Sequence, residues 1–304
     1  MSAVMAKSAI LRPVVGERLR NGLVRLSKSA WLALNPRTSL EVVQLFSSPE
    51  LRPVLRVEPR LMFKFLRDYL ATDLSRKERA AMLIHHYAFL KDRVGERFYA
   101  QIIDRRLELC SLDEGDEAHR IWLSFPRTPY SEGDLILTFE VGGDDIYTLS
   151  FTIGPGAIAG LAAPDAMYVA RVQGKGKGLE RIRQATKDCC DISPAALLLT
   201  AAEGIAEALD LDHMVGIGAT TQVAPRERAK FENLFKAYDE FWKSVGGSPL
   251  HRNMYHLPVP MPGKPITSVK RDHRSRAQRK RRYKRAVKDR VRDTFRERAL
   301  IGGR

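Results

Sequence analysis

The sequence predicts an α+β protein. A helical N-terminal part leads into a mixed, mostly antiparallel sheet with flanking helices, and a basic helix closes the chain. Three observations predict this arrangement. Residues 61–70 and 76–91 carry apolar side chains at helical spacing. Residues 135–141 and 146–153 alternate apolar and polar side chains, which is typical of half-buried strands. The helical spacing then returns in the stripe that Leu198, Ala202, Ile205 and Leu209 form.

The composition is that of a globular protein, and the spacing of its cysteines does not indicate a metal site. Of 304 residues, 44% are hydrophobic, so the chain can bury a substantial core. No apolar run is long enough to cross a membrane. The three cysteines, Cys110, Cys189 and Cys190, lack the spacing of metal ligands, and no other cluster supplies it. Reduced cysteines are typical of the cytoplasm.

The net charge of +15 is concentrated at the two ends of the chain. Residues 270–298 hold 15 lysines and arginines against 4 acidic residues, a sum of +11. Residues 1–60 hold 10 against 4, or +6, whereas residues 61–269 hold 25 against 28, or −3. We therefore divide the chain into four parts. They are a basic N-terminal arm (1–45), a helical segment (46–105), an α+β core (106–265) and a basic C-terminal tail (266–304).

The first two parts are predicted to be helical. Residues 11–34 form an amphipathic stretch that can lie on an anionic membrane surface, or can pack on the protein through the same apolar face. Ser75 and Glu78 fit a capping box, so a helix is expected to begin at residue 76. His85 and His86 in this helix point about 100° apart and are not expected to share a metal.

Short apolar or alternating runs bounded by turn residues predict the sheet. Residues 142–145, Gly-Gly-Asp-Asp, are expected to form a hairpin turn. The predicted strands are residues 107–112, 120–125, 135–141, 146–153, 167–172, 213–219 and 253–259. The predicted helices around them are residues 179–188, a helix that begins at Ser193 and Pro194, and residues 226–245.

A glycine loop joins the strand predicted at residues 167–172 to the helix that follows. Its residues are Gln173, Gly174, Lys175, Gly176, Lys177 and Gly178. A loop between strand and helix can direct backbone N–H groups and the helix dipole at an anion, and the two lysines add positive charge. The loop lacks the Walker A and dinucleotide-binding patterns. It is therefore either an anion site of another kind or a solvated turn.

A series of short motifs over roughly residues 60–285 resembles the VirK/YbjX family of bacterial proteins. The motifs are His86-Tyr87 with Leu90, Tyr147-Thr-Leu-Ser-Phe151, Gln173-Gly174, Ala185-Thr-Lys187, Leu197-Leu-Leu199, Tyr238-Asp-Glu-Phe-Trp242 with Gly246-Gly247, and Leu257-Pro258. The resemblance implies a virulence-associated role in envelope stress and in resistance to antimicrobial peptides. The family often has histidines at two places where this chain has Cys189-Cys-Asp191 and Ala219-Thr-Thr-Gln222.

The loop pattern Gln-x-x-Gly-x-Gly, formed by Gln173, Gly176 and Gly178, also resembles the pyrophosphate loop of the GNAT acyltransferases. The order of sheet, loop, helix, strand and helix is similar to that fold. The resemblance implies that the loop binds coenzyme A or an acyl-coenzyme A. It also implies that Tyr238 protonates the leaving thiolate, although packing in an aromatic-rich helix is the alternative role. Glu140 or Asp145 could act as a base if either reaches the loop.

The basic residues 271–298 allow three interpretations. They can bind anionic lipid head groups, they can bind nucleic acid, or Val287, Val291 and Phe295 can pack a structural helix on the protein. We expect lipid rather than nucleic acid, because aromatic side chains are too sparse to stack on bases. The expected location is the cytoplasm, at or near the inner membrane. The expected function is a coenzyme A-dependent acyltransferase of the envelope response, or a non-enzymatic protein that binds membrane or RNA through its basic ends.

Overall fold

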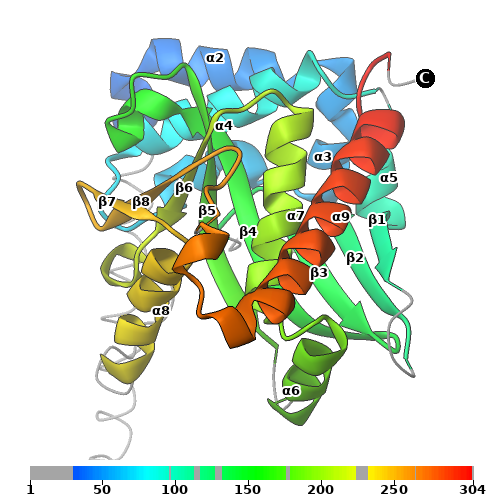
Figure 1. Cartoon of the computed structure of the whole chain (residues 1–304). Coiled ribbons are helices and arrows are strands. Elements are labelled where there is room, and N and C mark those ends of the chain that lie inside the picture. The colour runs from blue at the N-terminus through cyan, green and yellow to red at the C-terminus, as the bar shows by residue number, and fades with distance from the viewer. Residues whose placement is uncertain are drawn as a thin grey trace, which may run out of the picture.

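The computed structural model describes residues 30–95, 97–112, 117–126, 132–175, 179–223, 232–263 and 265–302. In these ranges the chain forms a single sheet with helices around it (Figure 1). The sheet has eight strands in the order β1-β2-β3-β4-β5-β6-β8-β7. All neighbouring strands are antiparallel except β5 and β6, which are parallel. The predicted α+β class and the mostly antiparallel sheet are confirmed.

The strands lie close to their predicted positions. They are β1 Leu107–Leu112, β2 His119–Ser124, β3 Leu135–Val141, β4 Asp144–Pro155, β5 Asp165–Gly174, β6 His213–Ile217, β7 Ser248–Leu250 and β8 Met254–Pro258. The turn between β3 and β4 has Gly142 and Gly143 at φ of +56° and +89°. Glycine adopts this left-handed region without steric cost, which explains the predicted hairpin.

The helices form two groups. The first group, α2 Pro36–Phe46, α3 Arg52–Val57, α4 Arg76–Lys91 and α5 Phe98–Asp104, precedes the sheet. The second group is α6 Leu179–Asp188, α7 Pro194–Ala208, α8 Glu232–Ser244 and α9 Arg274–Ala299. Short 3-10 helices are η1 Pro49–Leu51, η2 Leu61–Leu66, η3 Gly156–Ala159, η4 Ala219–Thr221, η6 Ile266–Ser268 and η7 Arg271–His273.

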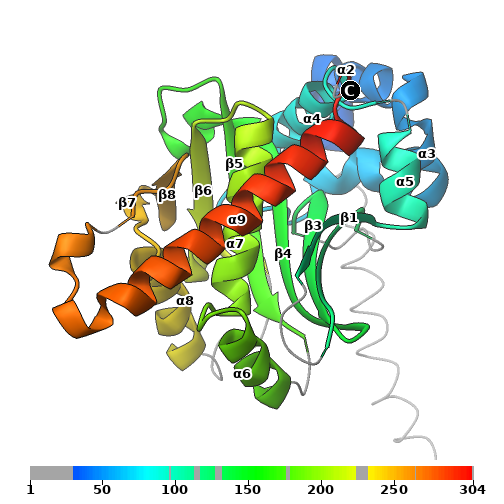
Figure 2. The same cartoon turned by 45° about the vertical axis from the view of Figure 1, so that its right-hand side comes forward.

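Helices cover both faces of the sheet. Along β4 the side chains alternate, so Gly154 faces α4 while Ile153 faces the other side. A Cβ at Gly154 would lie 2.2 Å from the Met82 methyl group, so α4 and the sheet approach closely there. On the opposite face lies α7, with α9 crossing its outer side (Figures 1 and 2). The sheet is therefore the middle layer of the molecule.

The predicted capping box begins α4. The Ser75 side chain accepts a hydrogen bond from the Glu78 backbone, and the Glu78 carboxylate accepts one from the Ser75 backbone. The helix predicted over residues 61–70 is wrong in its type and length, because only η2 forms and it has 3-10 geometry. Of the amphipathic stretch 11–34, residues up to 29 lie outside the described ranges. The Trp31 ring packs 5.3 Å from the Phe65 ring, between centroids.

The C-terminal helix α9 packs on the protein through its apolar stripe. Val287, Val291, Phe295 and Ala299 are buried, and they recur at i, i+4, i+8 and i+12 along the helix. A Cβ at Gly204 of α7 would lie 2.6 Å from the Lys288 carbonyl oxygen, so the absence of a side chain there allows the two helices to approach. The packing interpretation of this stripe is the one that the structure shows. In the described ranges, no helix has both the length and the hydropathy that a membrane span requires.

Candidate functional site at the open edge of β5

The parallel strands β5 and β6 pair only at their beginning. Met167, Tyr168 and Val169 pair with residues of β6, and the last of these pairs is Val169 with Gly216. Beyond this point β5 continues to Gly174, and no strand of the described ranges pairs with it on that side. An open stretch of strand inside a sheet leaves backbone groups for another partner.

A β-bulge lies where the two strands separate. On the β4 side, Val169 pairs with Phe151 and Arg171 pairs with Ser150, so Ala170 is an additional residue in β5. A bulge bends a strand and increases its twist, and it often lies next to a functional site. The bulge thus gives a physical reason for the divergence of β5 from β6.

Two side chains occupy the open edge. The Gln222 side-chain amide donates to the Ala170 carbonyl at 3.2 Å, and the Val172 N–H donates to the Tyr238 hydroxyl at 2.9 Å. A carbonyl and the N–H two residues later are the groups that a parallel neighbouring strand would bond. Gln222 and Tyr238 therefore take the place of a continued β6. Of the two residues, Tyr238 was predicted from the sequence as a site residue and Gln222 was not.

Helix α8 is held in place by contacts next to Tyr238. The Trp242 ring is buried over Gly216, where a Cβ would lie 2.5 Å from the ring, and its Nε1–H donates to the Ile217 carbonyl at 3.0 Å. The Asp239 carboxylate accepts from the Ala219 N–H at 2.8 Å and from the Asn253 amide at 3.1 Å. These contacts fix the helix, so that Trp242 packs against β6 while Tyr238 lies at the edge of β5.

Burial raises the pKa of the Tyr238 hydroxyl well above its usual value, and the bond that it accepts from the Val172 N–H offsets this only in part. The hydroxyl is therefore protonated at neutral pH, as a proton donor has to be. An ion pair lies at the same edge, where Arg171 Nη1 donates to both carboxylate oxygens of Glu132 at 2.9 and 3.2 Å. The edge of β5 thus brings together a phenol, an amide, a carboxylate and a guanidinium.

The first part of the predicted glycine loop lies at the end of β5. Gln173 and Gly174 still pair with β4, and the Lys175 N–H donates to the Ile146 carbonyl at 2.9 Å. The side chains of Gln173 and Lys175 are exposed. Gly176, Lys177 and Gly178 lie outside the described residues. Their predicted role as an anion site stays a prediction.

Asp145 reaches this loop, but it already has two cationic partners. The Lys175 Nζ lies 2.8 Å from Asp145, and Arg106 donates to both of its oxygens at 2.8 and 2.9 Å. Although desolvation raises the pKa of the Asp145 carboxyl, the bonds from Arg106 and Lys175 lower it below the usual value. Glu140 lies 3.7 Å from Arg106 and 3.5 Å from Arg120. Neither carboxylate is a free base.

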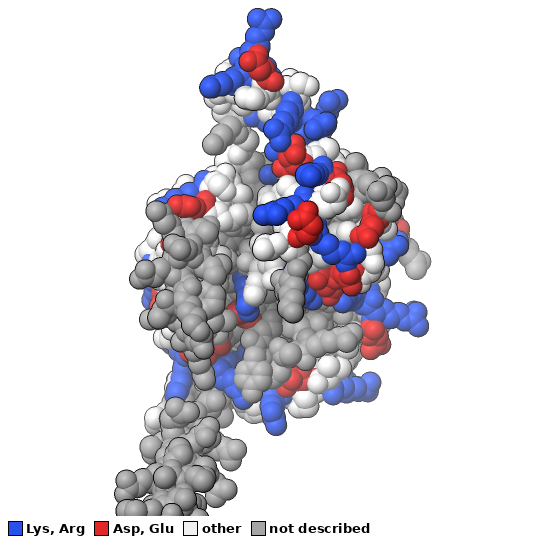
Figure 3. Space-filling view, turned by 90° about the horizontal axis from the view of Figure 1, so that it is seen from below, with Lys and Arg blue, Asp and Glu red and all other residues white. Residues whose placement is uncertain are grey.

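Seen from below, basic and acidic side chains are intermixed over the described part of the surface (Figure 3).

A buried ionic cluster that was not predicted from the sequence lies under the start of β3. The Asp134 carboxylate accepts hydrogen bonds from Lys64 at 2.9 Å, from Thr152 at 2.7 Å and from the Tyr69 hydroxyl. Burial lowers the pKa of Lys64, whereas the Lys64 charge holds the pKa of Asp134 below its usual value despite desolvation. The cluster joins η2 to the sheet. All of its members are buried, so it is a structural anchor next to Glu132.

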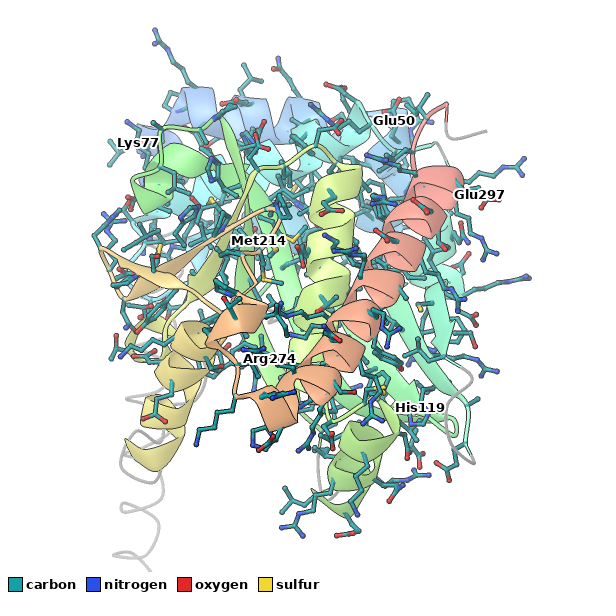
Figure 4. The ribbon with its side chains drawn as sticks, in the orientation of Figure 1. Glu50, Lys77, His119, Met214, Arg274 and Glu297 are labelled. Carbon is teal, nitrogen blue, oxygen red and sulfur yellow. The ribbon has the colours of Figure 1, made fainter. Side chains whose placement is uncertain are left out.

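Several of the described histidines lie close to one other polar side chain. His85 lies 2.7 Å from Asp165, the two nearest ring nitrogens of His213 and His256 lie 3.0 Å apart, and His119 lies 3.6 Å from Asp188. His119 is at the end of the sheet near α6 (Figure 4). Within the described ranges, no group of three or more histidine, cysteine or acidic residues could hold a metal ion.

Comparison with known proteins places the chain in a family. Residues 21–293 match the model of a family described as a protein of unknown function (DUF535). The chain belongs to the DUF535 family. It is 28% identical over 256 residues to the uncharacterized protein YbjX of Escherichia coli strain K12, over 82% of this chain and 76% of that protein. No solved structure matches the chain. The resemblance to the VirK/YbjX family is thus confirmed, and the GNAT likeness stays a prediction.

Proposed function

We propose that this DUF535 protein is a coenzyme A-dependent acyltransferase of the bacterial envelope response, with its acyl donor bound along the open edge of β5. The observation that carries the proposal is the separation of β5 and β6 after Val169 and Gly216, directly before the glycine loop. An extended ligand with amide groups can bond the carbonyl of Ala170 and the N–H of Val172 in such an opening. The envelope setting is what the family resemblance implies.

The residues at the opening fit an acyl-coenzyme A in charge and in hydrogen bonding. Gln173 and Lys175 are exposed at the end of β5, where they could contact the pyrophosphate. Coenzyme A would supply an activated acyl thioester. The Tyr238 hydroxyl accepts from the Val172 N–H and is protonated at neutral pH. It would donate its proton to the leaving sulfur of the thioester. Because Tyr238 and Gln222 now bond the edge, the ligand has to displace at least one of them.

Titration calorimetry with coenzyme A and acetyl-coenzyme A tests the proposal. The intact protein should release or absorb heat with both ligands, whereas Gly176→Asp should abolish binding because a carboxylate repels the pyrophosphate. Lys187→Gln is the matched control, since it also changes the charge by one unit but lies on the exposed side of α6. It should bind as the intact protein does.

Tyr238→Phe separates binding from catalysis in the same assay. If Tyr238 is the proton donor, the variant should still bind coenzyme A but transfer acyl groups about 100-fold more slowly or worse. The absence of any heat with the intact protein at millimolar coenzyme A would exclude the acyltransferase.

A second candidate function is non-enzymatic attachment to an anionic membrane surface through the basic ends. The observation that favours it is the charge of residues 274–285, where eight lysines and arginines occur without an acidic residue. Attachment by charge weakens with salt, since the Debye length falls to about 8 Å at physiological ionic strength. Binding of the intact chain to anionic vesicles should therefore fall steeply as salt is raised.

A further inference from the structure

The two halves of α9 differ in their balance of charge. Residues 274–285 hold eight basic residues and no acidic one, whereas residues 286–299 hold five basic and three acidic residues. The second half is also the part whose apolar stripe, from Val287 to Ala299, is buried. Packing on the protein therefore requires the second half and does not explain the charge of the first.

Three of the five basic residues of the second half have acidic partners on α7 and after it. Lys288 lies 2.6 Å from Glu207 and 3.3 Å from Glu203, and Arg292 lies 3.4 Å from Glu207. Arg296 lies 3.8 Å from Asp210. This half of α9 is thus matched in charge to the surface that it covers.

On one side of the first half lies the acidic residue Asp191. Asp191 accepts from Arg276 at 2.8 Å and lies 4.0 Å from Arg279, and its carbonyl accepts from Lys280 at 2.8 Å. Arg274, Arg282 and Arg285 are exposed, and no ion pair joins them to a described acidic side chain. At about 100° per residue these three lie within about 80° of one another around the helix. We call them the α9 arginine row.

The arginine row lies where it does not stabilise the helix. Positive charges near the first turns of a helix oppose its dipole, and Arg282 and Arg285 repel each other across one turn. Arg274 lies at the start of α9, next to the positive end of the dipole (Figure 4). Stability would favour acidic or neutral residues at these positions. An external anion would relieve both effects at once.

We propose that the α9 arginine row is the contact surface for the phosphate groups of anionic lipids. The proposal rests on the second candidate function and assigns it to one half of one helix. The first half of α9 continues beyond α7 and extends outward from the body of the molecule (Figure 2), so the row can meet a flat surface along about 17 Å. We commit to lipid rather than nucleic acid because the row has no aromatic side chain that could stack on a base.

Two triple variants of the full chain test the proposal. One replaces Arg274, Arg282 and Arg285 by glutamine, and the other replaces Arg290, Arg296 and Arg298, which lie on the second half of the same helix. Both remove three positive charges. Partitioning is measured by co-sedimentation with vesicles of phosphatidylglycerol and phosphatidylcholine, and with vesicles of phosphatidylcholine alone.

The first variant should partition about a hundredfold more weakly into anionic vesicles, since each basic side chain at such a surface contributes about fivefold. Its thermal midpoint should not fall, which excludes unfolding as the cause. The second variant should partition nearly as the intact chain does. An equal loss in both variants would reduce the effect to net charge and overturn the proposal.

Three other results would also overturn it, and they differ in what they leave standing. If neither variant loses binding while the intact chain binds, another basic segment makes the contact, and the second candidate function stands without the row. If the intact chain does not bind anionic vesicles, both fail. If only labelled RNA binds, and the first variant loses that binding, the row contacts nucleic acid instead.

Discussion

His86 shows how the environment of one residue decides its chemistry. The residue is fully buried, and its Nδ1 accepts from the Ile153 N–H at 3.1 Å. Its Nε2 has no hydrogen-bond partner among the described residues. Burial lowers the pKa of His86 from 6.5 to about 4, so the ring is neutral at physiological pH. Its role is to bond the backbone of β4 from α4.

The pKa of His86 predicts how stability depends on pH. The unfolded chain binds a proton at this residue near pH 6.5, but the folded protein binds it only near pH 4. Stability therefore falls as the pH falls through this range, by up to about 1.4 kcal/mol per pH unit. His86→Asn keeps an acceptor for the Ile153 N–H and cannot titrate, so its slope should be smaller by that amount. Urea unfolding at a series of pH values measures it, and equal slopes would show that His86 titrates normally.

At the scale of the element, α9 unites a structural stripe with a basic outer surface. Its apolar residues pack on α7 and on α5, where the Phe98 and Phe295 rings lie 6.1 Å apart between centroids. From the sequence, packing and surface binding are alternatives for this segment. The structure shows that one face packs, and the proposal concerns only the opposite face of its first half.

The packing predicts large losses from substitutions in the stripe. Phe295→Ala should lower the free energy of unfolding by about 3–5 kcal/mol, because it leaves a cavity where the side chain is fully buried. The nearby Arg298→Ala, at an exposed position, should change it by at most about 0.5 kcal/mol. Chemical denaturation followed by circular dichroism provides both values. Similar small effects in the two variants would mean that the helix is only loosely attached.

At the scale of the whole molecule, one apolar core runs through the parts that composition separates. Buried residues from Val42 of α2 to Ala299 of α9 belong to one continuous cluster. The ionic bonds of Lys64 and Tyr69 with Asp134 add a polar connection between the helical segment and the sheet. The parts of the chain that differ in net charge therefore differ in their surface, whereas they share one apolar interior.

The shared core predicts that the sheet does not fold without the helical segment. A fragment of residues 106–304 would expose the surface of the sheet that α4 covers and would leave the Asp134 carboxylate without its lysine, which costs several kcal/mol. Its amide proton spectrum should show little dispersion. The full chain should unfold in one transition. A well-dispersed spectrum of the fragment would contradict this and would support an independent α+β domain.

Local patterns were enough for most elements. Strands β1 and β3 and helices α4 and α6 have the predicted bounds, because alternation, helical spacing and capping depend on residues that are close in the chain. The short edge strand β7 was not predicted, since its three residues, one of them Pro249, carry too little pattern. The helix predicted over residues 61–70 was wrong. Residues 61–66 form the 3-10 helix η2, and its geometry follows from packing under the sheet.

Only part of the candidate site could be predicted from the sequence. The glycine loop and Tyr238 could be named from residue types, but the bond between Tyr238 and Val172 spans 66 positions. The bulge at Ala170, the open edge of β5 and the partners of Asp134 likewise depend on which strands and helices become neighbours. Periodicity reflects whether a side chain is buried, and it is encoded in adjacent residues. Which groups meet is decided by packing over the whole chain, and no short segment of sequence carries that information.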